Sequence, residues 1–347
     1  MALRSKIILS LLAIMAAYMI LNYQIQKKII SPNFAELERT EAEKDIKRCV
    51  EALQREIYHL DSLCRDWAAW DDSCEFVADK NKDYIDANLV PESFTANALN
   101  IIYIIDKNRK IVWGEVRDLT TEELLTVKEF YSDWFEPSDH PFFVHEDNNS
   151  DYLEKATVKG IYMTESGPVM VASRPIITSK YEGPVRGWIV MGRFLNTNVI
   201  EMLKKQTGVN FKIWSVGQDT LPDDEEAVLH QIVKENKYYI KEQNDDKLHV
   251  YTTVPDINGN TELLLKAVVK RDITSKGQET VHFAMLSITV VGALILVALL
   301  LLLNRLIVKP LGKLTFQMKK IGPPMATSKS PTCGRVKIPH PQAAERV

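Results

Sequence analysis

The stretch Phe283–Leu303, which reads FAMLSITVVGALILVALLLLL, decides the class of this protein. Its 21 residues include no charged side chain. At about 1.5 Å of rise per residue, a helix of this length spans roughly 30 Å, the thickness of the hydrocarbon layer of a membrane. A helix that is apolar on every face is not expected at the core of a domain of this size. The stretch therefore predicts a transmembrane helix over residues 283–304.

A shorter apolar block covers residues 7–23, directly after Arg4 and Lys6. Its length is at the lower limit for crossing a bilayer, which is about 17 residues. A cleaved signal peptide is the alternative, and it would require small residues in an A-x-A-like arrangement after the block. The sequence there is MILNYQ, over residues 19–24. We therefore predict an uncleaved transmembrane helix over 7–23.

The basic residues beside the spans predict the orientation. Positive side chains are enriched on the cytoplasmic side of membrane helices. Arg4 and Lys6 precede the first span, and five positive residues follow the second: Arg305, Lys309, Lys313, Lys319 and Lys320. Lys27 and Lys28 favour the opposite orientation only weakly, because a long segment is translocated largely regardless of its positive charges. We expect a two-pass inner-membrane protein with both termini in the cytoplasm and residues of roughly 24–282 outside.

Composition excludes several classes of protein. The net charge of −3 over 347 residues argues against binding of nucleic acid, which requires a strongly basic face. Cys49 and Cys64 would lie about 22 Å apart on one helix and could not pair, so we expect free thiols. The spacing of His and Cys matches no metal site. No set of residues indicates catalysis, and we expect neither a metal nor a cofactor.

A long helix is predicted after Ser31-Pro32-Asn33, because Gly and Pro are absent from there to Pro91. We expect it to cover 34–80. Its apolar residues alternate in steps of four and three, as in a heptad seam: Ile46, Val50, Leu53, Ile57, Leu60, Cys64 and Trp67. Such a stripe forms either the contact of a parallel homodimer, which we expect, or the face that packs on the chain's own domain.

The predicted helix leads into DWAAWDDSCEF, residues 66–76. Trp67 and Trp70 are three positions apart, so on a continuous helix they would share one face and cover a large apolar area. We expect both to be structural. Asp71 and Asp72 follow as acceptors at a helix end or in a loop. They cannot share one proton as catalytic dyads do, because adjacent residues diverge on a helix.

This region resembles the fourth class of CHASE domains, which are sensors outside the membrane in prokaryotic signalling receptors. The resemblance covers about Ile57 to Gly208. It rests on the W-x-x-W-D-D run and on motifs that follow in order: Tyr84, Asn88-Leu89, Ile101–Trp113 around Asp106, Ala172–Ile176 and Gly187–Arg193. It implies an α+β fold with a PAS-like antiparallel sheet, placed here in residues 30–208.

The strand pattern is compatible with that plan. Five strands separated by tight turns are predicted: 100–105, 110–116, 156–164, 168–177 and 184–194. A helix over Thr120–Tyr131 is expected to interrupt them. A second, smaller α/β lobe is predicted over 209–275, with strands at 211–216, 238–243, 247–254 and 262–270 and a helix at 224–235.

Candidate ligand-binding residues are few: Arg174, Asp71, Tyr103 and Tyr162. The planar fork of Arg174 suits a carboxylate or a phosphate, but the same side chain could pair with Asp71 or Asp72 and fix a helix to the sheet. Tyr103 and Tyr162 could line a pocket, although tyrosines are common in half-buried strands. Arg193 is a weaker candidate of the same kind. The expected partners are an unknown small molecule, a second copy of the chain and membrane lipid.

After the second span, VKPLGKL resembles the start of a HAMP linker, and we expect a partial HAMP-like helix over 305–322. In that case Pro310, Leu311 and Leu314 would take part in signal transmission. Residues 323–347 are polar and rich in proline, which predicts a disordered tail.

The expected function is that of a membrane-bound receptor that detects a small ligand or another external cue and transmits a conformational signal. One alternative is the input half of a histidine kinase or diguanylate cyclase whose catalytic domain is missing from this chain. The other is a membrane scaffold protein without a sensory role.

Overall fold

The computed structural model describes residues 3–131, 134–137, 139–143, 150–235, 238–244 and 246–320. The chain divides into two units, one of Met1–Ile25 with Val281–Val347 and the other of Gln26–Thr280. The predicted tail at 323–347, together with the last residues of the HAMP-like segment, lies outside the described residues.

The first unit contains the two predicted spans. The helix α1 covers Leu3–Ile25, and α9 covers Asp272–Leu303, followed by a short π-helical turn and α10, Lys309–Lys320. Two helical segments, Lys6–Ala68 and Asp272–Leu314, are long and apolar enough to cross a membrane, and their most apolar windows are not buried by protein. By length and composition, the described part of the chain therefore has two candidate membrane helices.

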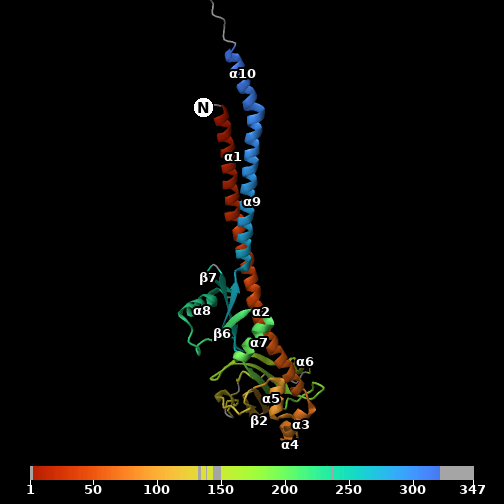
Figure 1. Cartoon of the computed structure of the whole chain (residues 1–347). Helices are drawn as coiled ribbons and strands as arrows, with labels where there is room; N and C mark the ends of the chain where they lie inside the picture. Colours follow the sequence, from red (N-terminus) through yellow and green to blue (C-terminus); the bar gives the residue numbers. More distant parts are fainter. Residues whose placement is uncertain are drawn as a thin grey trace, which may run out of the picture. The chain divides into compact units, whose positions relative to one another are not determined.

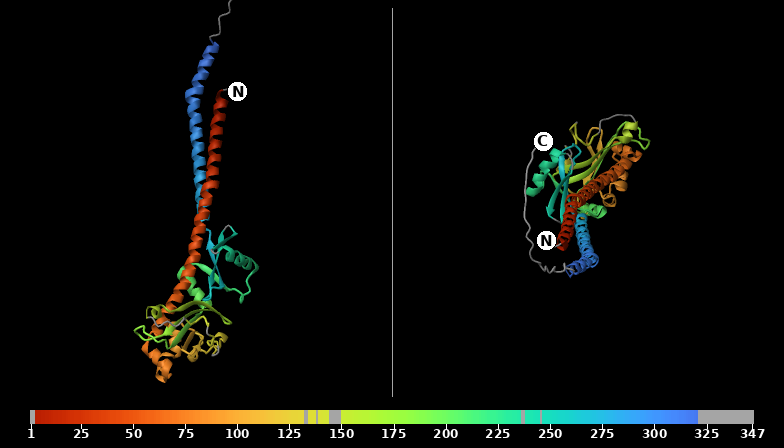
Figure 2. Two further views of the ribbon diagram at one scale, coloured as in Figure 1. Left: turned by 180° about the vertical axis from the view of Figure 1, so that it is seen from behind. Right: turned by 90° about the horizontal axis from the view of Figure 1, so that it is seen from above.

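In the second unit, the helix α2, Ser31–Ala68, is the element on which both sheets pack (Figures 1 and 2). A stripe of small and apolar side chains covers its inner face: Ala42, Ile46, Cys49, Ala52, Leu53, Ile57, Leu60, Cys64 and Ala68. These residues belong to one core that continues into both sheets. The stripe thus packs on the chain's own domain. The idea that this seam is a dimer contact is wrong, while a homodimer by another surface stays a prediction.

The prediction of one helix over 34–80 is also wrong, because the helix ends at Ala68. Ala69 has φ −95° and ψ 52°, and Trp70 is extended. The backbone N–H of Ile177 donates to the carbonyl of Ala68, which ties the break to the sheet. Three short helices follow: α3 (Asp71–Asp79), α4 (Lys82–Asn88) and α5 (Pro91–Asn97). Trp67 and Trp70 therefore do not share one helical face.

The first sheet has the five antiparallel strands that the sequence predicts, in the order β2-β1-β5-β4-β3. Their bounds are Ile101–Asp106 (β1), Ile111–Val116 (β2), Val158–Thr164 (β3), Gly167–Ile176 (β4) and Gly187–Phe194 (β5). The α+β fold class is confirmed. One face of the sheet packs on α2, mainly through β4 and β5.

The helix predicted over Thr120–Tyr131 does not form. Asp118 Oδ1 accepts hydrogen bonds from the backbone of Thr120 and Thr121, and Leu124 forms a β-bridge with Arg117. These contacts hold the segment in a turn and an extended strand-like path, because local side-chain acceptors compete with helix formation. Between β2 and β3, the described residues form the 3₁₀ turn η2, Lys128–Phe130, and the helix α6, Ser150–Lys155.

The helix α7, Thr197–Thr207, leads into a second sheet with the order β6-β9-β8-β7. Its elements are β6 (Asn210–Ser215), α8 (Asp223–Glu235), β7 (Tyr239–Asn244), β8 (Lys247–Pro255) and β9 (Thr261–Lys270). The tip between β8 and β9 meets β3 of the first sheet, where the Ile257 N–H donates to the Ile161 carbonyl at 2.8 Å. The two sheets are thus joined at α2 and at this tip.

Leu53→Ala should destabilise the protein by about 2–5 kcal/mol, because the side chain is 1% exposed in the core and its loss leaves a cavity. Chemical unfolding of the purified chain in detergent measures this. The matched control is Leu37→Ala on the same helix, where the side chain is 54% exposed and the expected change is within about 0.5 kcal/mol. Equal effects of the two substitutions would contradict the packing of this stripe.

Candidate functional site

The predicted ligand-binding residues lie on opposite faces of the first sheet. Arg174 is buried on the face of β4 that packs on α2. Tyr103 and Tyr162 are buried on the other face, in a cluster with aromatic side chains from the long connection between β2 and β3. The ring centroids of Tyr103 and Phe130 are 5.3 Å apart, and the hydroxyl of Tyr162 accepts a hydrogen bond from the indole N–H of Trp134. The structure therefore does not combine these residues into one site.

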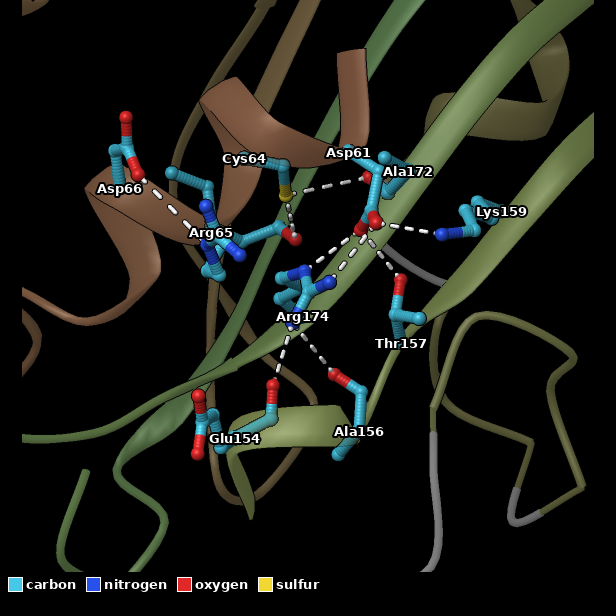
Figure 3. A network of polar contacts seen from close by, with 11 residues as sticks. Asp61, Cys64, Arg65, Asp66, Glu154, Ala156, Thr157, Lys159, Ala172 and Arg174 are labelled. Carbon is cyan, nitrogen blue, oxygen red and sulfur yellow. Dashed lines mark hydrogen bonds and ion pairs between the residues drawn. The ribbon is translucent and has the colours of Figure 1, made fainter. Parts of the chain in front are cut away.

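Asp61 of α2, which the sequence did not single out, is the partner of Arg174 (Figure 3). Its carboxylate is 2% exposed and binds the guanidinium by two hydrogen bonds, Nε–Oδ1 at 2.6 Å and Nη2–Oδ2 at 2.9 Å. Lys159 of β3 and Thr157 add contacts of 2.7 Å each. We call these four residues the Asp61 network. The predicted alternative of a structural ion pair applies to Arg174, but its partner is Asp61 in place of Asp71 or Asp72.

The other donors of Arg174 point to the carbonyls of Glu154, at 3.1 Å, and Ala156, at 3.4 Å. The hollow beside it measures only about 10 Å³. A water molecule needs at least about this volume, so an organic ligand has no room here. In this structure Arg174 joins a helix to a sheet, and its role as a ligand clamp has no support from the geometry.

The charge of Asp61 is set by opposing effects. Burial alone would raise the pKa of this carboxyl, but hydrogen bonds from Arg174, Lys159 and Thr157 outweigh it and lower the pKa to about 2. Asp61 is therefore ionised at neutral pH. A buried carboxylate and guanidinium are tolerable only because each satisfies the other, so the relative position of α2 and β4 is closely fixed.

Asp71 and Asp72 stand in the exposed first turn of α3. Asp71 accepts hydrogen bonds from the backbone N–H of Ser179, at 3.0 Å, and from its hydroxyl, at 2.7 Å. These bonds lower the pKa of Asp71. Trp70 packs against Tyr84, with ring centroids 5.9 Å apart. The conspicuous tryptophan and aspartate motif therefore shapes the end of the domain and anchors the loop at Ser179.

Arg193 makes a second connection between α2 and the first sheet. Its Nη1 lies 3.1 Å from Oε2 of Glu56 on α2, and its other donors bind the carbonyls of Ala98 and Asn97. The guanidinium thus donates three hydrogen bonds, one to the carboxylate of Glu56 and two to backbone carbonyls. Arg193 also forms part of the wall of a hollow that residues of the first turns of α7 line.

A third buried charge lies at the other end of α2. Glu38 is 2% exposed and accepts hydrogen bonds from the Thr274 hydroxyl at 2.5 Å, the Thr274 N–H at 3.2 Å and Arg271 Nε at 3.2 Å. Arg271 and Thr274 lie where β9 turns into α9. One turn away, a Cβ added to Gly277 would come within 2.8 Å of the Phe34 ring, so the two helices pack closely. We call Glu38, Arg271 and Thr274 the Glu38 network.

Sequence reasoning missed both carboxylates, although a signal exists. Glu38 stands four positions before Ala42, and Asp61 four positions after Ile57, so each occupies a place on the buried stripe of α2. A charged residue at a buried helical position requires a partner, because an unpaired buried charge is costly. The identity of the partners, by contrast, depends on contacts between distant segments.

The residues predicted for signal transmission lie in α10. Pro310 is in its first turn, and Leu311 and Leu314 are about half exposed. The three cysteines in the described part of the chain, Cys49, Cys64 and Cys74, are free thiols. Burial raises the pKa of each.

Part of the unit that contains these networks matches a known protein family. Residues 52–214 match the model of the CHASE4 domain. The segment is a CHASE4 sensor domain. The domain therefore begins within α2 and ends in β6, and it includes the whole Asp61 network but not the Glu38 network.

The methanogenesis regulatory histidine kinase FilI of Methanothrix harundinacea is 27% identical over 275 residues. That alignment covers 78% of this chain but 29% of the kinase. Among solved structures, a domain of a sensory box/GGDEF family protein from Vibrio parahaemolyticus is 9% identical, with a TM-score of 0.47 over 70% of this chain and 99% of that one. The sensor domain of the V. cholerae histidine kinase DctB is 11% identical, with a TM-score of 0.37 over 69% and 98%.

Asp61→Asn should destabilise the CHASE4 domain by about 3–5 kcal/mol, because it leaves Arg174 without a buried countercharge. It should also change the acid dependence. The pKa of Asp61 in the folded protein, about 2, lies below its ordinary 3.8, so its contribution is present above pH 3.8 and is lost as the pH falls toward 2. Urea unfolding between pH 2 and 7 measures both effects.

Asp66→Asn is the matched control for this substitution. Its side chain is 70% exposed and lies 3.8 Å from Arg65, so the expected loss is at most about 1 kcal/mol. If Asp61→Asn has the same stability and the same acid profile as the unaltered chain, the Asp61 network does not hold α2 to the sheet.

Proposed function

We propose that this chain is the sensory part of a membrane receptor of the histidine-kinase type, and that α2 carries the state of the CHASE4 domain toward the membrane. The observation that supports this most directly is the placement of two buried carboxylates on one helix. Asp61 joins α2 to the CHASE4 sheet, and Glu38 joins the same helix to the start of α9. The two residues are 23 positions apart, about 35 Å along a helix axis.

The energetics favour movement of α2 as a rigid rod. Removing one partner from a buried ion pair costs about 3–5 kcal/mol, so a shift of the CHASE4 sheet is less costly if α2 follows it. The helix α1 is joined to α2 by the π-helical segment Gln26–Ile30, and α9 contains the second candidate span. A change at the sheet would therefore be passed to both candidate membrane helices by their own covalent continuity.

A signal also requires two states of similar free energy. A ligand shifts such an equilibrium only by its differential affinity for the two states. The two sheets provide a place for this, because among the described residues they are joined by the shared helix α2, by the tip around Ile257 and by a hydrogen bond from Gln218 to the Thr164 carbonyl. We propose that ligand binding changes the relative position of the two sheets and that the Glu38 network passes the change to α9.

The proposed receptor also has a particular output domain and membrane topology. The relative of known function is named a regulatory histidine kinase, and the chain spans 29% of its length. We propose a kinase output, with both termini in the cytoplasm of an inner-membrane protein, the domain outside and a homodimer as the working form. In this scheme Pro310, Leu311 and Leu314 belong to a HAMP-like helix after the second span. A small-molecule ligand and membrane lipid are its other expected partners.

Cysteine labelling tests the topology. Thr220→Cys, on an exposed loop of the second sheet, should react with an impermeant maleimide in intact cells. Lys313→Cys, in α10, should react only after the cells are permeabilised. Labelling of Thr220→Cys only in permeabilised cells would show that the domain is cytoplasmic and would contradict the receptor proposal.

A chimera tests transmission. Residues 1–320 are joined to the part of the Methanothrix kinase that follows its aligned region, and autophosphorylation is measured in membranes. Glu38→Ala should change the activity several-fold, because it removes the buried acceptor for Arg271 and Thr274. Glu43→Ala, an exposed site on the same helix, should leave it unchanged. An activity that neither substitution changes would show that the Glu38 network carries no signal.

A further inference from the structure

A cavity of about 410 Å³ lies at the end of the first sheet, on the side from which α7 departs. It is partly open to solvent. Its walls come from the start of β1, the loop after β2, the turn between β3 and β4, the end of β5 and the first two turns of α7. The volume is within the range of small-molecule sites, about 300–1,000 Å³. It is far larger than the hollow beside Arg174.

The lining carries one uncompensated charge, and it is negative. Arg193 is the cation in the wall, and its guanidinium is paired with Glu56 and bound to two carbonyls. Asp118 is the anion. Its Oδ1 accepts hydrogen bonds from the N–H groups of Thr120 and Thr121, at 2.7 and 2.9 Å, which lower its pKa and keep it ionised.

The surroundings of Asp118 strengthen this negative potential. The loop 118–125 reads DLTTEELL, so it adds Glu122 and Glu123. Arg117, the cation directly before the loop, is paired with Glu115 at 2.7 Å and donates to the Glu122 carbonyl. Clefts lined by one sign of charge concentrate ligands of the opposite sign. A ligand with two or more negative charges would find no free cation among the lining residues. A ligand with one positive charge would find a carboxylate that no ion pair neutralises among the contacts the structure describes.

The rest of the wall suits hydrocarbon. The apolar lining side chains come from the loop, from β5 and from α7: Leu119, Leu125, Phe194, Val199 and Met202. Leu125 is 39% exposed at the opening. Burial of apolar ligand surface against such side chains contributes about 25 cal/mol per Å². The cavity therefore offers an anionic group beside an apolar wall.

We infer that this cavity binds an organic monocation, an ammonium group on a compact hydrocarbon body, with the charge at Asp118 and the body against Leu125, Val199 and Met202. The inference rests on the proposed sensory function and deepens it by naming the class of ligand. The position also suits a sensor, because the cavity wall includes both the end of the CHASE4 sheet and the start of α7, which leads to the second sheet.

Three probes of matched size test the class: phenethylammonium, 2-phenylethanol and 3-phenylpropionate. Binding to the full chain in nanodiscs is followed by the shift in thermal midpoint and by titration, with empty nanodiscs to correct for partition into lipid. Phenethylammonium should bind best. Asp118→Asn should weaken its binding roughly tenfold or more, since a hydrogen bond to a charged group contributes about 1.5–3 kcal/mol. Asparagine keeps the oxygen that accepts from Thr120 and Thr121, so the loop should stay folded.

Two further variants make the result specific. Glu123→Gln removes the same charge from the same loop outside the cavity wall, and it should leave binding within about twofold, because an exposed charge is largely screened. Leu125→Trp should fill the opening and abolish binding without a loss of fold.

Stronger binding of the carboxylate, equal binding to Asp118→Asn, or no binding of phenethylammonium at millimolar concentration would each overturn the inference. The kinase chimera separates this from the proposed function. If Glu38→Ala alters its activity while no ammonium binds, only the ligand class is wrong. If ammonium binds but the chimera does not respond to Glu38→Ala, the transmission proposal is wrong.

Discussion

The structure depends on the need to compensate two buried carboxylates on one helix. Asp61 and Glu38 stand on the buried face of α2, and each obtains its partners from a different part of the chain. Apolar packing along α2 would tolerate small slips, because dispersion contacts are not directional. A bidentate bond to Arg174 does not tolerate them. These two points therefore fix the register of both sheets on the same helix, while the apolar stripe between them supplies most of the burial.

Much of the fold follows from local features of the sequence. The five strands of the first sheet and the four of the second are rich in apolar residues and are separated by turns such as Asp106-Lys107-Asn108, so their positions along the chain were predictable. The apolar stripe of α2 was also predictable, but the surface on which it packs was not. A heptad-like repeat indicates that a helix buries one face. It is equally compatible with packing against another chain and with packing against the protein's own sheets.

The failures have a common physical cause, which is that contacts distant in sequence override local propensity. Residues 69 and 70 leave the helix without a Gly or Pro, because the Ala68 carbonyl accepts a hydrogen bond from Ile177, directly after β4. The segment after Asp118 contains good helix formers, yet the cap at Asp118 and the bridge to Leu124 hold it extended. The pairing of Arg174 with Asp61 joins residues 113 positions apart, and no local pattern specifies it.

The contact of Ile257 with β3 has a consequence for how this domain is inherited and engineered. The matched segment 52–214 includes β6 but not β9, the strand with which β6 pairs, and it omits the tip that covers the outer edge of β3. Excision at those limits would leave unpaired strand edges, which invite association with other chains. Residues 26–280 keep both sheets, the Ile257 tip and the Glu38 network together, so we expect a transplant of this domain to succeed only with cuts outside that range.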